Sequence, residues 1–197
     1  MLMWVHSLIG GLTLLVCGCV HVASADDPSH HSPVSASAHG HGYALLYDLM
    51  GDERNVSKLL IVKRGRPELG ILIKRISNIC GEAHEQLEKF AKAYPQVDLK
   101  DQGLPAAEIE TRKEISRTRG KELLADKGKE FELQLLLNQN EALTYGSHLA
   151  TTIARGEERS TRAEFLRKLS RDLGQLRQRI VSMLLEGYTW EGSKEPQ

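Results

Sequence analysis

Apolar residues recur at helical spacing along most of the chain after residue 42. In four stretches they fall on one face of a helix with 3.6 residues per turn, the pattern of an amphipathic helix packed against a core. The alternation typical of β-strands is nearly absent. The chain is therefore predicted to be all-α, with helical regions over residues 43–65, 67–94, 107–154 and 161–187.

Glycine and proline mark the ends of these predicted helices. Gly65 is expected to close the first helix and Pro67 to open the second, because glycine is favoured after a helix and proline in its first turn. Thr161 and Glu164 have the spacing of a capping box, which predicts the start of the last helix. Gly187 is expected to end that helix.

The region 107–154 is too long to be one helix of a compact domain, since it would extend about 70 Å without a break. We predict a break near Gly120 or Gly128. The piece before the break, residues 107–126, is highly charged and is expected to lie at the periphery.

Four amphipathic helices with short or moderate connections predict an antiparallel four-helix bundle over residues 43–187. The charged piece would form an extra short helix before the third helix of the bundle. Residues 188–197 are expected to be a frayed tail. An extended coiled coil is the alternative, which the proline and glycine breaks disfavour.

The first 25 residues contain no Lys, Arg, Asp or Glu and include an apolar run from Leu8 to Val16. This run is shorter than the roughly 20 residues of a membrane-spanning helix and fits the core of an export signal. The box Val16-Cys17-Gly18-Cys19 resembles the bacterial lipobox, which predicts a signal peptide over residues 1–18 and lipidation of Cys19. A rival cleavage site follows Ala23-Ser24-Ala25 and would release an exported protein without a lipid.

Residues 19–42 are rich in Ser, Ala, Gly and His and contain almost no large apolar side chain. Such a composition cannot form a core, so we predict a flexible tether between the lipid and the domain. The tether carries His30, His31, His39 and His41. Short His-rich tracts can bind Zn, Cu or Ni, but this irregular spacing predicts weak binding or none.

Composition excludes several functions. The chain has 26 basic and 26 acidic residues, whereas a nucleic-acid-binding protein would favour a basic surface. Outside the export segment Cys80 is the one cysteine, and its place on an apolar stripe predicts a buried, inert thiol. No nucleophile elbow, phosphate-binding glycine loop or Cys-x-x-Cys pair is present, which favours a non-enzymatic protein and leaves an enzyme open.

A metal site between the helices is the main chemical candidate. The Glu-x-x-His motif of di-iron bundles is absent, but Glu53 and Glu132 fall within apolar arcs and His84 lies at the edge of one. A buried carboxylate must be paired, protonated or bound to a metal. These three residues could therefore hold Fe, Mn or Zn. The alternative, in which no cofactor is present, is that both carboxylates pair with Arg or Lys or lie near helix ends.

Short motifs point to a family. They are the sequence HEQLEKFA ending the second helix, Gly103-Leu104-Pro105 in the loop, and Gly128-Lys129-Glu130-Phe131-Glu132. In their order along residues 43–186 they resemble exported bacterial proteins of unknown function with a ferritin-like fold, often labelled predicted outer-membrane proteins. The resemblance implies a ferritin-like bundle carried in lipoprotein form.

The expected function is a non-enzymatic interaction or stress-related module of the bacterial envelope. It would face the periplasm from the cell membrane or the outer membrane, held by the lipid on Cys19 and contacting a protein partner there. A ferritin-like metal-binding protein or oxidoreductase using Glu53, His84 and Glu132 is the runner-up. A metal chelator using the His-bearing tether is a third possibility.

Overall fold

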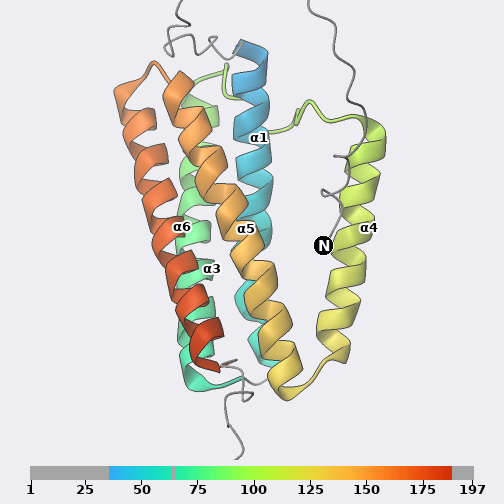
Figure 1. The fold of residues 1–197 in the computed structure, drawn as a ribbon. Helices are drawn as coiled ribbons and strands as arrows, with labels where there is room; N and C mark the ends of the chain where they lie inside the picture. The colour runs from blue at the N-terminus through green and yellow to red at the C-terminus, as the bar shows by residue number, and fades with distance from the viewer. Residues whose placement is uncertain (1–35, 64, 188–197) are drawn as a thin grey trace, which may run out of the picture. The chain divides into compact units, whose positions relative to one another are not determined.

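The computed structural model describes residues 36–63 and 65–187 and is all-helical in this part of the chain. Its elements, shown in Figure 1, are α1 (Ala36–Glu53), the single-turn η1 (Val56–Lys58), α2 (Leu59–Val62), α3 (Pro67–Ala93), α4 (Ala106–Ala125), α5 (Gly128–Gly156) and α6 (Ser160–Gly187). The predicted signal peptide, Cys19 and the tail over 188–197 lie outside the described residues. No described helix is both long and apolar enough to cross a membrane.

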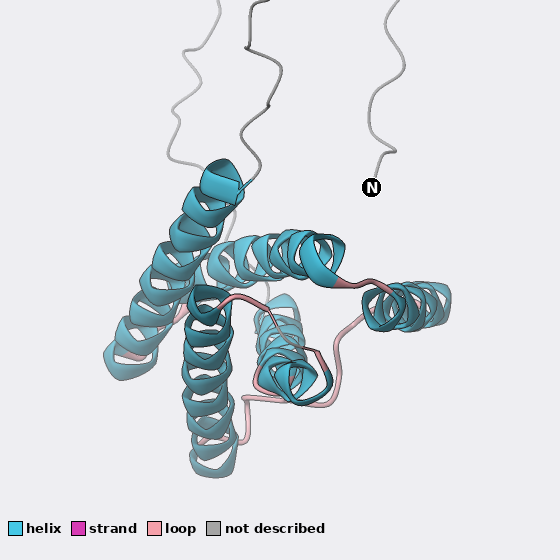
Figure 2. Cartoon of the chain, turned by 90° about the horizontal axis from the view of Figure 1, so that it is seen from below, coloured by secondary structure: helices cyan, strands magenta, loops and turns pink. Residues whose placement is uncertain are grey.

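The four helices α1, α3, α5 and α6 pack side by side. α5 packs along α6 and α1 along α3, while α1 also contacts α5 and α3 also contacts α6. Figure 1 shows α1 and α6 running in one direction and α3 and α5 in the other, so each packed pair is antiparallel. α4 contacts mainly α5 and stands to one side of the other helices, as the end-on view in Figure 2 shows.

The core forms from the apolar stripes that the periodicity predicts. α3 spans Pro67–Ala93 as expected and buries one continuous stripe; its buried apolar residues are Leu69, Leu72, Ile73, Ile76, Cys80, Ala83, Leu87 and Phe90. Each large aliphatic side chain of this kind contributes about 1.5–3 kcal/mol on burial. Gly146 allows close packing where helices meet, because a Cβ there would lie 2.9 Å from Leu49 Cδ2 and 3.1 Å from Leu173 Cδ1.

A buried ion pair fastens the turn between α5 and α6 to α1. Arg162 donates to both carboxylate oxygens of Glu157 at 2.9 and 2.7 Å, and the Tyr43 hydroxyl donates to Glu157 Oε2 at 2.5 Å. Burial alone would raise the pKa of Glu157, but the hydrogen bonds from Arg162 and Tyr43 outweigh it and lower that pKa to about 2. The Arg162 guanidinium also lies 4.6 Å from the centre of the Tyr94 ring. None of these contacts was predicted.

The first predicted helix is wrong at both ends. It begins at Ala36 rather than Tyr43, so residues 36–42 of the predicted tether are helical. Gly42 is already closely packed there, since a Cβ would lie 2.9 Å from Ile153 Cγ1. At the other end α1 stops at Glu53 instead of continuing to Gly65. The Asn55 amide donates to the Gly51 carbonyl at 2.8 Å, and a side chain that bonds the backbone in this way competes with helix continuation.

The predicted break before the third long helix is confirmed at Gly128, which has a positive φ of 54°. This is the left-handed region that glycine adopts without steric cost. Gly120, the other candidate, lies inside α4. The peripheral position predicted for the charged piece is also confirmed, since Leu123 is the one buried side chain of α4. The capping box was placed too late, because α6 begins at Ser160 and Thr161 already lies within it.

Candidate functional site

The three predicted metal ligands do not converge. Glu53 ends α1, His84 lies in the middle of α3 and Glu132 lies in the first turns of α5. Within residues 36–63 and 65–187 no group of three or more His, Cys, Asp or Glu side chains is arranged to hold a metal ion. Each of the three has protein partners of its own.

Glu132 pairs with an arginine, as the alternative to a metal site predicted. Its Oε2 lies 3.0 Å from Arg66 Nε, and its Oε1 accepts a hydrogen bond of 2.7 Å from the Arg66 backbone N–H. The carboxylate thereby bridges α5 to the residue that precedes α3. These contacts use both oxygens, so the role of Glu132 in this fold is to connect the two helices.

His84 lies in a separate cluster and is more buried than its position at the edge of the stripe predicted. Its side chain is 6% exposed, and its ring stacks on Tyr47 with centroids 4.0 Å apart. Nδ1 lies 3.0 Å from Arg54 Nη1, and the Tyr47 hydroxyl donates to Glu88 Oε1 at 2.8 Å. Burial and then the Arg54 charge lower the pKa of His84, so the neutral imidazole accepts from the guanidinium.

Among the described residues, Glu53 pairs with an amide and not with a cation or a group of metal ligands. Its Oε2 accepts a hydrogen bond of 2.7 Å from Gln139 Nε2 on α5. Burial raises the pKa of Glu53 to about 7, an effect that the Gln139 hydrogen bond partly offsets and the Asp52 carboxylate increases. No ion pair reaches the Glu53 carboxylate from the part of the chain that the structure describes. Near neutral pH this group is therefore divided between its acid and its carboxylate form.

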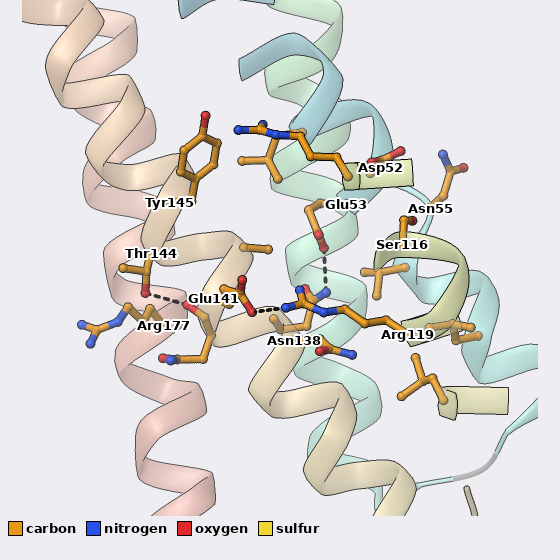
Figure 3. A pocket seen from close by; sticks show the side chains of 18 of the residues that line it. Asp52, Glu53, Asn55, Ser116, Arg119, Asn138, Glu141, Thr144, Tyr145 and Arg177 are labelled. Atoms are coloured by element: carbon orange, nitrogen blue, oxygen red, sulfur yellow. Dashed lines mark hydrogen bonds and ion pairs between the residues drawn. The ribbon is translucent and has the colours of Figure 1, made fainter. Parts of the chain in front are cut away.

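Glu53 and Gln139 line a groove of about 1220 Å³ between α4 and the α1–α5 face. We call it the α4 groove. Figure 3 shows Glu53 entering it from α1 and Arg119 entering it from α4. Its apolar lining includes Leu49, Val56, Leu59 and Leu123. A concave surface that joins apolar walls to a few polar groups is the usual form of a ligand site.

Few side chains hold α4 over this groove. Arg119 Nη2 lies 2.9 Å from Glu141 Oε2 on α5, and both side chains are more than one-third exposed. In the loop before α4, Gln102 donates to Asp48 at 3.0 Å. Exposed pairs of this kind contribute little, about 0–1 kcal/mol. With one buried side chain of its own, α4 is expected to be the least firmly held of the long helices.

Gln139 is a candidate site residue that the sequence patterns did not single out. It is 4% exposed, and its carbonyl Oε1 accepts no hydrogen bond from the described protein groups. A buried acceptor in this condition costs about 1–3 kcal/mol. The signal was present in the sequence, because Gln139 falls on the same face of its helix as Leu135, Leu136 and Leu143. Glu53 was selected because it is a polar residue on an apolar stripe, and Gln139 meets the same criterion.

A scan against protein-family models, a search of curated proteins and a search of solved structures each found no match to this chain. The functional argument therefore rests on the groove and on the residues that line it.

Proposed function

We propose that this chain is a non-enzymatic binding module of the bacterial envelope and that the α4 groove is its binding site. The observation that carries the proposal is the groove itself, a large concavity on the one face of the bundle that α4 covers loosely. Its lining combines apolar side chains with Glu53 and Gln139; in the described part of the chain no ion pair reaches Glu53 and no donor reaches Gln139 Oε1. The module is exported and held at the membrane by the lipid on Cys19.

The proposed fold of the module is an antiparallel four-helix bundle of the ferritin-like type, with α4 as the added helix. Ferritin-like folds contain one long crossover connection. Here α3 and α5 run in the same direction in Figure 1, and α4 with its two loops returns the chain from the end of one to the start of the other. This connectivity supports the resemblance given by the short motifs.

The metal-binding alternative has less support from the site. Glu132 is engaged by Arg66, and His84 accepts from Arg54 in a different part of the fold. Elemental analysis of the purified full chain decides between the two functions. Stoichiometric Fe, Mn or Zn that is lost in Glu53→Gln would overturn the binding-module proposal in favour of a metalloprotein.

The groove is tested by filling it. Ser116 lies on the face of α4 that lines the groove, whereas Thr118 lies outside the lining and is exposed. With the neutral dye Nile red as probe, we expect saturable binding to the full chain, measured by fluorescence titration. Ser116→Trp is expected to weaken the dye about tenfold, which corresponds to about 1.4 kcal/mol, because the indole occupies its space. Thr118→Trp is the matched control and should leave the affinity unchanged.

Two results would contradict the assignment of this groove as the binding site. One is the absence of saturable dye binding to the full chain. The other is equal weakening by Ser116→Trp and Thr118→Trp, which would mean that the indole acts through the helix and not through the groove.

The lipid anchor is tested in cells. Replacing Cys19 by Ser is expected to move the protein from the membrane fraction to the soluble periplasmic fraction, because the acyl chains that anchor it would have no cysteine to carry them. Fractionation followed by immunoblotting measures the change, with Cys17→Ser as the matched control that keeps the membrane location. If both variants stay in the membrane fraction, the anchor is not the lipid on Cys19.

A further inference from the structure

Glu53 and Gln139 present two hydrogen-bond acceptors to the α4 groove. The Glu53 carboxylate receives one donor, the Gln139 amide at 2.7 Å, and the charge that acts on it most directly is another carboxylate, Asp52. On the other side of the pair, Gln139 Oε1 is buried and accepts nothing from the described protein groups. A carboxylate and a carbonyl oxygen from neighbouring helices thus lie together, and no described protein group donates to the carbonyl oxygen.

The charges around this acceptor pair indicate the sign of the missing group. Two arginines line the groove from α4, but Arg112 pairs with Glu108 at 2.8 Å and Arg119 pairs with Glu141 at 2.9 Å. The charges of these two arginines are therefore compensated within the protein. The third arginine of the lining, Arg177 on α6, does not contribute to the pKa of Glu53. Glu53 has no such partner, and a buried carboxylate is stabilised by a cation that also donates hydrogen bonds.

The walls indicate the remainder of the ligand. The lining that contains the acceptor pair also includes Leu49 of α1, Val56 of η1, Leu59 of α2 and Leu123 of α4. An alkyl chain placed against these side chains would be removed from water, which is favourable in proportion to the apolar area covered. An ammonium ion without such a chain would gain only the polar contacts.

We propose that the α4 groove binds an organic cation with an alkylammonium head, which donates hydrogen bonds to Glu53 and to Gln139 Oε1 while its chain lies against the apolar wall. The proposal rests on the α4 groove being the binding site, and it adds the class of ligand. Burial disfavours the carboxylate form of Glu53 and so raises its pKa to about 7. A bound ammonium ion would compensate the charge of that form, which supports the proposal.

The test compares three probes of equal chain length on the full chain by isothermal titration calorimetry at about pH 8, where Glu53 is ionised. The probes are octylammonium, the neutral octanol and the anionic octanoate. We expect octylammonium to bind at least about tenfold more tightly than octanol. Glu53→Gln and Gln139→Leu should each remove most of this preference and leave octanol binding in place. Glu130→Gln, on an exposed side chain of α5, is the matched control.

The possible outcomes separate this inference from the function on which it rests. If octanoate binds best, the head-group site is formed by the arginines, among them Arg177, and the ammonium proposal is wrong. If all three probes bind equally, or if Glu53→Gln leaves the preference unchanged, the acceptor pair does not recognise a cation. In these cases Nile red still binds and the groove remains a binding site. Loss of Nile red binding as well would remove the proposed function itself.

Discussion

Arg162→Met is expected to lower the free energy of unfolding by about 3–5 kcal/mol, because removal of one member of a buried ion pair leaves the other charge buried without compensation. The side chains of Arg162 and Glu157 are 7% and 1% exposed, and the guanidinium forms two hydrogen bonds to the carboxylate. After the substitution, Tyr43 and the Arg159 backbone N–H would remain among the donors to Glu157, but both hydrogen bonds from the Arg162 guanidinium would be lost.

Urea unfolding at neutral pH measures this loss, and Arg167→Met is the matched control because Arg167 is exposed on the same helix. The control is expected to change stability by less than about 0.5 kcal/mol. The double variant Glu157→Leu/Arg162→Met should recover most of the loss, since an apolar pair of similar volume often replaces a buried ion pair without penalty. A loss of under about 1 kcal/mol in the single variant would show that water reaches Glu157 and that the pair is not truly buried.

The same pair gives a pH dependence with a defined sign. The pKa of Glu157 is about 2 in the folded chain, below its ordinary value of 4.5. A carboxyl whose folded pKa is depressed stabilises the fold above its unfolded pKa, and the contribution disappears as the pH falls from about 4.5 toward 2. Between about pH 4.5 and 2, the free energy of unfolding is expected to fall less in the double variant than in the natural chain, because the double variant has no carboxylate at this position.

The helices that were predicted correctly are those with a strong local signal in their own sequence. α3 has a strong apolar stripe and proline at its first position, and both of its ends were predicted closely. Gly128 also acts locally through its backbone, and the break there was found. The start of α1 depends instead on packing against residues distant in sequence, such as Gly42 against Ile153, which no local pattern reveals.

The candidate site was predictable only in part. The helical periodicity of the sequence places Glu53 on an apolar face. The identity of its partner depends instead on the register of α5 against α1, which brings Gln139 Nε2 to 2.7 Å from Glu53 Oε2. The same periodicity does not distinguish Glu132 from Glu53, although Glu132 pairs with Arg66 and Glu53 accepts from the Gln139 amide. The groove exists because α4 stands away from α1, and the sequence of α4 indicates only that this helix is polar on most sides.

Glu53→Gln is expected to stabilise the protein above neutral pH, by about 3 kcal/mol at about pH 8. The pKa of Glu53 rises from an ordinary 4.5 to about 7 on folding, so the folded state holds its proton through this range while the unfolded state releases it. The free energy of unfolding of the natural chain therefore falls as the pH rises from 4.5 to about 7 and stays low above it. Glutamine has no proton to lose and still accepts from Gln139.

Urea titrations at about pH 4.5 and about pH 8 measure the effect as a difference between the variant and the natural chain, so that other titrating groups cancel. The difference should be near zero at the lower pH and reach its full size at the higher one, while Glu130→Gln shows neither. An equal difference at both pH values would mean that Glu53 does not titrate between them. Glu53→Gln is also expected to lose most of the preference for octylammonium. A variant that is both more stable and without this preference would indicate that this carboxylate lowers stability in order to recognise a ligand. Binding groups are often kept in less stable arrangements than the fold alone would favour.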